Sequence, residues 1–188
     1  MDRLILDIIE KYYPKDSALW YIYMAHANSV TSLVLKIAAD NPQLKMDEKF
    51  LEYGGMLHDI GIYMTNAPEI ECYGSFPYLA HGYLGRELLE KEGLPHVAPV
   101  CERHIGVGIS LDDIQKHNLP LPLRDMTPRT PEERLICYAD KFYSKSARDL
   151  SRPKPLKMVR KAIRKYGNDK WDVFKEMIAV FGLDCVYE

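Results

Sequence analysis

Apolar side chains recur every three or four residues along most of the chain, which is the spacing of one face of an α-helix. The first such row ends before Pro14 and consists of Leu4, Ile5, Ile8, Ile9 and Tyr12. A second helix is predicted over residues 17–39, beginning at the capping residue Ser17. Its inward positions are Leu19, Tyr23, His26, Val30, Leu33 and Ile37. His26 therefore lies where an aliphatic side chain is expected.

A third helix is predicted over residues 47–60, with Gly61 as its C-terminal stop. It contains Gly54 and Gly55, and each glycine disfavours a helix by about 1 kcal/mol relative to alanine. Close packing against another helix is the explanation that we expect for this pair.

Further helical segments are predicted over residues 78–93, 95–104, a short stretch after 110, 130–140 and 155–181. The start at Thr130 is the clearest, because Pro131 and Glu133 complete a capping box with it. Alternating patterns typical of strands are nearly absent. We therefore predict a single all-α domain over residues 1–188, with a motif-bearing core at about 20–150 and C-terminal helices over 155–181.

The chain has 188 residues, enough for one domain with a substantial core, and its formal net charge is −2. This charge argues against a purely electrostatic nucleic-acid binder. Acids at Asp2 and Asp7 argue against an N-terminal signal peptide, and no apolar run approaches the roughly 20 residues that span a bilayer. The four cysteines are scattered without a C-x-x-C pair, as is typical of a reducing compartment. We expect a cytoplasmic protein with no membrane partner.

Four of the six histidines lie on four different predicted helices, and three of them lie within apolar rows. They are His26, His58, His81 and His104. One buried histidine commonly finds hydrogen-bond partners among neighbouring residues. Four buried histidines in a small domain leave many ring nitrogens without partners. A shared metal site solves this problem, because neutral imidazole is the commonest metal ligand in proteins. Asp59 and Asp140 supply carboxylate oxygens for the same ions.

His58 and Asp59 are neighbours in the stretch YGGMLHDIGIYM, so on a helix their side chains point about 100° apart. Both side chains can reach one ion that lies beside the last helical turn, which is where Gly61 places them. We therefore expect both residues to be metal ligands, with Asp59 bridging two ions.

The order His26, then His58-Asp59, then Asp140 resembles the HD domain superfamily of metal-dependent phosphohydrolases. The sequence HDIG at 58–61 is typical of its HDIG branch, and the segments HGYLGRELL, RHIGVGI and YADKF resemble that branch as well. Within it the chain is similar to the bacterial symmetrical diadenosine tetraphosphate hydrolases. The resemblance implies a compact helical bundle with the site at its centre. It also implies that His81 and His104 complete a second site, so that two divalent ions are bound.

The resemblance further implies a phosphohydrolase in which a metal-bound hydroxide cleaves a phosphate ester or anhydride of a nucleotide or dinucleotide. Asp59 and His58 are then catalytic, and the implied metal ligands are His26, His58, Asp59, His81, His104 and Asp140. Nitrogen and oxygen ligands without thiolate suit iron, manganese, cobalt, nickel or zinc. Two alternatives stay open, namely a mixed-valent di-iron oxygenase on the same ligands and a non-catalytic metal domain that binds a nucleotide. Ile62 stands where binuclear relatives commonly carry a lysine, which argues against a cyclic-dinucleotide substrate.

Basic residues that follow the last aspartate of the motif are candidates for substrate binding. The residues at helical spacing after Asp140 are Lys141, Ser144, Lys145 and Arg148. We expect Lys141 and Arg148 to hold substrate phosphates, together with Arg103 beside the fourth histidine. A solvated basic face explains the same pattern equally well.

The aromatic segment 66–78 is interpreted either as a lid over the substrate or as a surface loop packed by its own side chains. Residues 152–170 contain eight lysines and arginines and one acid, but in a chain of net charge −2 we interpret them as a solvated face. The expected partner is therefore a small phosphate substrate, first of all a nucleotide, rather than a nucleic acid. A homodimer is left open.

Overall fold

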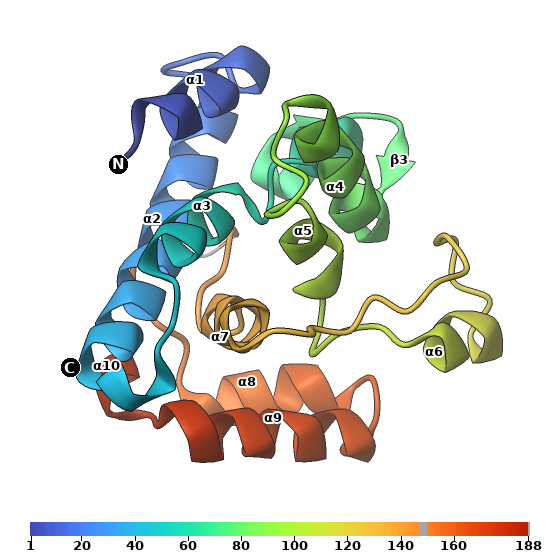
Figure 1. The fold of residues 1–188 in the computed structure, drawn as a ribbon. Coiled ribbons are helices and arrows are strands. Elements are labelled where there is room, and N and C mark those ends of the chain that lie inside the picture. The colour runs from blue at the N-terminus through green and yellow to red at the C-terminus, as the bar shows by residue number, and fades with distance from the viewer. Residues whose placement is uncertain (147–149, 188) are drawn as a thin grey trace.

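The computed structural model describes residues 1–146 and 150–187, and α-helices account for most of them (Figure 1). The helices are α1 (Arg3–Tyr12), α2 (Ala18–Asp40), α3 (Glu48–Leu57), α4 (His81–Lys91), α5 (Pro99–Arg103), α6 (Leu111–Lys116), α7 (Pro131–Asp140), α8 (Leu156–Arg164), α9 (Asn168–Phe181) and α10 (Asp184–Tyr187). The predicted all-α class is confirmed, because a small sheet is the minor addition to this set.

The 23-residue helix α2 packs against both α3 and α7 (Figure 1). Gly54 and Gly55 explain how α3 fits between these two neighbours. A methyl group on Gly54 would lie 2.5 Å from Ile136 Cδ1 of α7, and one on Gly55 would lie 2.6 Å from Thr31 Oγ1 of α2. Both distances are far shorter than the roughly 4 Å of an ordinary apolar contact. The glycine pair is therefore required by helix packing, as expected.

Side-chain caps begin several helices at the predicted residues. Ser17 accepts a hydrogen bond from the Trp20 N–H at 3.1 Å, and Thr130 accepts one from the Glu133 N–H at 3.2 Å. Ser110 begins α6 with a complete capping box. Such caps satisfy backbone N–H groups that the first helical turn leaves unpaired, and each contributes about 1 kcal/mol.

Three helical details differ from the prediction. Helix α3 ends at Leu57, and Gly61 has φ −85°, so Gly61 is not the left-handed stop of that helix. A methyl group on Gly61 would lie 2.2 Å from the His81 carbonyl oxygen, so glycine is needed there for a close approach to α4. Helix α5 has only 5 residues, and Leu4, predicted to face the core, is 45% exposed.

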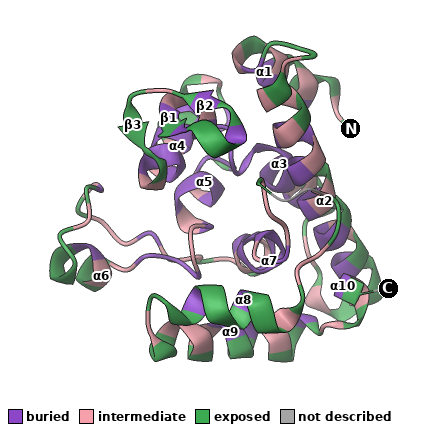
Figure 2. Cartoon of the chain, turned by 180° about the vertical axis from the view of Figure 1, so that it is seen from behind, coloured by how far each residue is buried: buried purple, intermediate pink, exposed green. Residues whose placement is uncertain are grey.

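Residues 65–77 contain a small sheet that the sequence pattern did not predict. Strand β1 (Thr65–Ala67) pairs antiparallel with β2 (Cys72–Tyr73) and parallel with β3 (Phe76–Pro77). Strands of two or three residues are too short to show an alternating pattern, which is why the segment was interpreted as a loop. The sheet lies beside α4 (Figures 1 and 2).

The C-terminal helices complete the apolar core. Val159 and Ile163 of α8, with Phe174 and Met177 of α9, are buried in one cluster with Tyr138 of α7. Burial of each large apolar side chain contributes about 1.5–3 kcal/mol. None of the helices in residues 1–146 and 150–187 combines the length and hydropathy of a membrane-spanning segment. The four cysteines, all in the described residues, form no disulfide.

Candidate metal centre

Five segments of the chain bring the six predicted ligands together. They are His26 in α2, His58 and Asp59 in the turn after α3, His81 at the start of α4, His104 directly after α5, and Asp140 at the end of α7. All six residues are buried, with exposed fractions of 8% or less. The C-terminal ends of α3, α5 and α7 meet at this point, and helix C-termini carry partial negative charge that favours cations.

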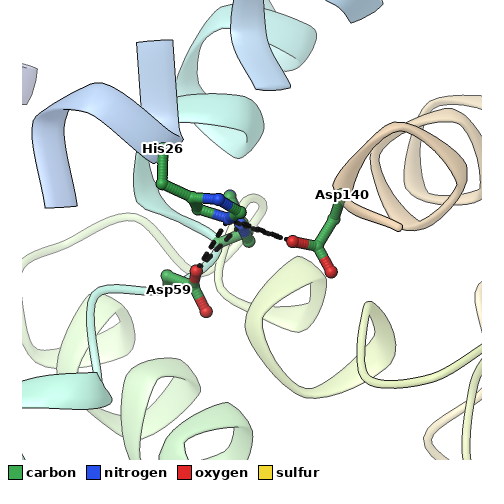
Figure 3. Close-up of side chains that lie close together, drawn as sticks. His26, Asp59 and Asp140 are labelled. Carbon is green, nitrogen blue, oxygen red and sulfur yellow. Dashed lines mark hydrogen bonds and ion pairs between the residues drawn. The ribbon is translucent and has the colours of Figure 1, made fainter. Parts of the chain in front are cut away.

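One group of ligand atoms surrounds Nε2 of His26 (Figure 3). This atom lies 3.2 Å from Asp59 Oδ2 and 3.0 Å from Asp140 Oδ1. It also lies 3.2 Å from Nε2 of His58, which is itself 3.1 Å from Asp59 Oδ2. Ligands held about 2.0–2.2 Å from a tetrahedral ion lie roughly 3.3 Å from one another. The observed spacing of these two nitrogens and two oxygens therefore suits a single ion.

A second group of ligand atoms uses the other oxygen of Asp59. Oδ1 of Asp59 lies 3.4 Å from Nε2 of His81 and 3.4 Å from Nε2 of His104. The two nitrogens are 3.3 Å apart. Asp59 thus offers one oxygen to each group, which is the arrangement of a carboxylate that can bridge two ions.

Hydrogen bonds on the far side of three rings favour one tautomer. The Nδ1 atoms of His58, His81 and His104 lie 2.8, 2.5 and 3.3 Å from backbone carbonyl oxygens, to which each can donate a proton. With that proton on Nδ1, the Nε2 atom of a neutral ring carries a lone pair directed at the site. Metal-binding histidines are usually held by such a second hydrogen bond.

Burial and neighbouring charges set the protonation of these groups. Burial lowers the pKa of His81 to about 3 and also lowers the pKa of His104, so both rings are neutral at pH 7. Burial also opposes a charge on His58, but the Asp59 and Asp140 carboxylates outweigh it and raise the His58 pKa to about 9. Although burial raises the pKa of both carboxyl groups, nearby cations hold it well below its usual value.

A bound cation would remove the repulsion among these atoms. When the neutral rings of His81 and His104 hold their protons on Nδ1, toward the backbone carbonyl oxygens, their Nε2 atoms direct lone pairs at each other over 3.3 Å. The buried Oδ1 atom of Asp59 lies beside both and has no hydrogen-bond partner in the described part of the chain. Such a contact between acceptors is unfavourable without positive charge. Four imidazoles and two carboxylates fit a divalent transition metal.

Lysine side chains supply positive charge next to this cluster. Nζ of Lys145 lies 2.6 Å from Asp59 Oδ2 and 3.9 Å from Asp140 Oδ1, and the side chain is only 12% exposed. Burial opposes this charge, but the carboxylates, Asp59 foremost, raise the pKa of Lys145 well above its usual value. Lys141 lies on the outer side, with Nζ 2.7 Å from Asp140 Oδ2 and 3.1 Å from the His104 carbonyl oxygen.

A cavity of about 290 Å³ opens beside Asp140. Its lining includes Tyr78, Lys141, Tyr143, Lys145 and Lys154. Lys154 comes from the segment before α8, where its backbone N–H donates to the Phe142 carbonyl oxygen at 2.6 Å. Burial lowers the pKa of Lys154 to about 8. The cavity therefore combines ammonium groups and aromatic rings next to the histidine and aspartate cluster.

Comparison with known proteins bears directly on this cluster. The HD domain family model matches residues 23–144, about two thirds of the chain, and this span contains all six clustered residues. The chain belongs to the HD domain family. The resemblance drawn from the order of histidines and aspartates is thereby confirmed at the level of the HD domain.

Three relatives show how this HD domain occurs in other proteins. A tRNA (cytidine(56)-2'-O)-methyltransferase of Picrophilus torridus is 30% identical over 124 residues, which is 65% of this chain and 32% of that enzyme. An uncharacterized protein of Methanocaldococcus jannaschii is 35% identical over 107 residues, 56% of each protein. A tRNA (cytidine(56)-2'-O)-methyltransferase of Thermoplasma volcanium is 29% identical over 140 residues, 74% of this chain and 35% of that enzyme. The chain thus matches about a third of each methyltransferase, and no solved structure gives a significant match.

Two cavity lysines lie beyond the part that matches the HD domain, namely Lys145 and Lys154. Sequence spacing left Lys145 either beside the metal or on a solvated helical face, and the helical face does not form because α7 ends at Asp140. The non-helical residues that follow bring Lys145 to Asp59 instead. Lys154 belongs to the segment 152–170 that is interpreted from the sequence as a solvated face, but its backbone hydrogen bond to Phe142 of the HD domain places it at the cavity.

The three residues predicted to bind substrate have different environments. Lys141 lines the cavity beside the HD domain cluster. Arg103 pairs with the buried carboxylate of Glu133, with Nη1 2.6 Å from Oε1, and it does not line that cavity. Arg148 lies outside the described residues.

Proposed function

We propose that this HD domain protein is a metal-dependent phosphohydrolase that acts on a nucleotide. The proposal rests on one observation, the direct contact between the histidine and aspartate cluster and a cavity lined by three lysines. Imidazoles and carboxylates suit divalent cations, whereas clustered ammonium groups suit phosphate oxygens. Asp140 belongs to both the cluster and the cavity wall, so the two kinds of group meet there.

The proposed cofactor is a pair of divalent transition-metal ions, of iron, manganese, cobalt, nickel or zinc. The ligands proposed for the first ion are His26, His58, Asp59 and Asp140. Those proposed for the second are Asp59, His81 and His104. Such ions polarise phosphoryl oxygens and lower the pKa of water to near neutrality. Asp59 and His58 are the proposed catalytic residues, because the Asp59 carboxylate faces both groups and the His58 ring lies against it.

The lysines have the proposed role of binding phosphate. A cation held by Asp59 would replace the charge that Lys145 now supplies, and the Lys145 ammonium could then pair with a phosphate oxygen in the adjoining cavity. Lys141 already lies at the cavity wall. Lys154, with a pKa of about 8, is mostly charged at pH 7 and adds a third cation.

A nucleotide is the proposed substrate class because Tyr78 and Tyr143 line the same cavity. Aromatic rings beside cations can stack on a nucleobase while the phosphates are held. A volume of about 290 Å³ is at the small end for ligand sites, so it suits the phosphate end of the molecule. The resemblance to the HDIG branch makes diadenosine tetraphosphate the first dinucleotide to test.

Two relatives are named as tRNA methyltransferases, but methyl transfer forms no part of this proposal. The match covers only about a third of each of those enzymes, so the activity in their names can belong to the other two thirds. We treat residues 1–188 as one proposed domain, because α8 and α9 share the apolar cluster of α7.

Metal analysis of the purified protein, combined with phosphate release from a panel of nucleotides and dinucleotides, tests the proposal. Asp59→Asn keeps the size of the side chain and removes the shared charge. We expect its turnover to fall at least about 100-fold, because changes to mere partners of metal ligands already lower activity about 10–100-fold. Asp112→Asn, an exposed position on α6, is the matched control and should keep full activity. Equal turnover by wild type and Asp59→Asn would refute the hydrolase.

A further inference from the structure

We propose that the exposed side of α8 binds the backbone of single-stranded nucleic acid. Basic side chains recur there every three or four residues, on the helix and its C-terminal cap, at Lys157, Arg160, Lys161, Arg164 and Lys165. All five are exposed, and together they line a surface hollow of about 390 Å³. We call these five residues the α8 basic face.

The positive charge of the α8 basic face is not neutralised by its neighbours. Arg164 Nε donates to the neutral Asn168 Oδ1 at 2.9 Å, and the Arg160 guanidinium lies 5.5 Å from the centre of the Trp171 ring. No carboxylate in residues 1–146 and 150–187 lies within salt-bridge distance of any of the five. The face is therefore free to attract an anionic partner.

Charge is strongly segregated along the chain. Residues 152–170 hold eight basic side chains and one acid, a net +7, so the remainder carries −9 in a chain of net charge −2. The expectation that nucleic acid is not a partner came from the net charge, which averages these two regions. Polyanion binding depends on the local electrostatic potential, and the side chains on one surface set that potential. The structure places five of these eight basic residues on one face.

A lipid bilayer fits α8 less well than nucleic acid does. Basic amphipathic helices bind membranes by inserting their apolar side. On α8 that side is already buried, since Val159 is 1% and Ile163 is 6% exposed in the cluster shared with α9. Figure 2 shows the solvent-facing side of α8 as largely exposed. Only the charged side is therefore available to a partner.

The dimensions and the aromatic neighbour of the face suit a single strand. Lys157 and Lys165 are eight residues apart, about 12 Å along a helix. A stacked strand carries one phosphate per about 3.4 Å, so three or four phosphates match this length. Tyr166 directly follows the face and is 77% exposed, so a base can stack on its ring. Basic side chains beside an exposed ring are the combination that binds single strands.

The segment that precedes α8 reaches the candidate metal centre. Lys154 lies two residues before α8 and lines the cavity beside Asp140. A strand on α8 could thus have its end near that cavity. Binding to α8 requires neither metal nor hydrolysis, so this proposal and the proposed function succeed or fail separately.

Fluorescence anisotropy of a labelled 20-nucleotide single-stranded RNA of mixed sequence tests the proposal, with the full chain in EDTA. A DNA strand of the same sequence is measured in parallel. The variant K157Q/K161Q/K165Q removes three charges from the α8 basic face. The control K45Q/K91Q/K116Q removes three exposed lysines from other helices and loops, so both variants have the same net charge. Circular dichroism melting shows that each variant is folded.

Each phosphate contact to a single strand contributes about −0.7 to the slope of log K against log salt concentration. Three or four contacts predict a wild-type slope of about −2 to −3, and K157Q/K161Q/K165Q should reduce its magnitude by about 2. The same variant should bind at least tenfold more weakly at 50 mM salt, and the control should stay within twofold of wild type. Tyr166→Ala should weaken binding about fivefold or more.

Three results would overturn the proposal. The first is an absence of RNA and DNA binding by the wild type at 50 mM salt. The second is equal weakening of binding by the two triple variants, since that would make total charge responsible rather than α8. The third is tighter binding to phosphatidylserine vesicles than to either strand, which would assign the face to membranes.

Discussion

Replacing Lys145 by methionine should destabilise the metal-free protein and leave the metal-loaded protein nearly unchanged. The substitution keeps the length of the side chain and removes an ammonium group 2.6 Å from Asp59 Oδ2 and 3.9 Å from Asp140 Oδ1. In the metal-free variant Asp59 would depend on the protonated His58 ring, whereas Asp140 would keep its ion pair with Lys141. In the metal-loaded variant, bound divalent ions would supply that charge.

The size of the effect follows from the burial of the pair. Removing one partner of a buried ion pair costs about 3–5 kcal/mol, and we take about 3 kcal/mol because the Lys145 side chain is 12% exposed. For a chain of this length 1 kcal/mol corresponds to about 2–4 °C, so the metal-free variant should melt about 6–12 °C below wild type. If the metal-loaded forms are equally stable, the thermodynamic cycle makes the variant bind metal about 100-fold more tightly.

Calorimetric melting with EDTA and with excess manganese, together with a metal-binding titration, measures both effects. Lys154→Met is the matched control, because Lys154 lines the same cavity and forms no ion pair with Asp59 or Asp140. Burial already lowers the Lys154 pKa to about 8, so removing this charge should not lower stability. If Lys145→Met shifts melting equally with and without metal, or not at all, then Lys145 is not the counter-charge of Asp59.

Four further predictions concern the cluster and the close approach beside it. Elemental analysis of His81→Ala should find one metal ion per chain instead of two, because the group around His26 keeps all its ligands. Loss of both ions would contradict the existence of two separate groups. Metal binding at pH 7 should release about one proton from His58, because the metal-free pKa of this residue is about 9. The release should disappear above pH 9. Calorimetry in buffers of different protonation enthalpy measures it. The same raised pKa stabilises the metal-free fold fully below the unfolded value of about 6.5, and this stability should be lost as pH rises through 9. Gly61→Ala should lower the free energy of unfolding by about 3 kcal/mol, because its methyl group would overlap the His81 carbonyl oxygen; an unchanged urea midpoint would refute the close approach.

The six clustered residues could be predicted because most of them depart from a local pattern. His26 interrupts an aliphatic row on α2, and His81 and His104 fall in apolar rows as well. Helix positions follow from periodicity and caps, which are local, so the faces that carry these histidines were correctly identified. The convergence of those faces was inferred from the cost of burying four imidazoles and from the family resemblance, because periodicity alone does not predict it.

The surroundings of the site depend on contacts between residues far apart in sequence. Lys145 reaches Asp59 because the chain leaves the helix after α7, and no spacing rule anticipates that turn. Arg103 pairs with Glu133 thirty residues later, a contact that local sequence spacing does not reveal. The basic residues of α8 are interpreted from the sequence as a solvated face, and the structure shows which of them share one exposed side.

The shared carboxylate of Asp59 makes the two ligand groups unequal. Around His26 there are two carboxylate groups, whereas the pair formed by His81 and His104 has only one oxygen of Asp59. Attraction to a divalent cation grows with the negative charge of its ligands, so the position around His26 would fill first. The first ion would then weaken the hold of Asp59 on the second, so the two affinities would diverge further. When metal is scarce the protein would exist mainly in a singly occupied form, and the proposed activity would follow the supply of the second ion.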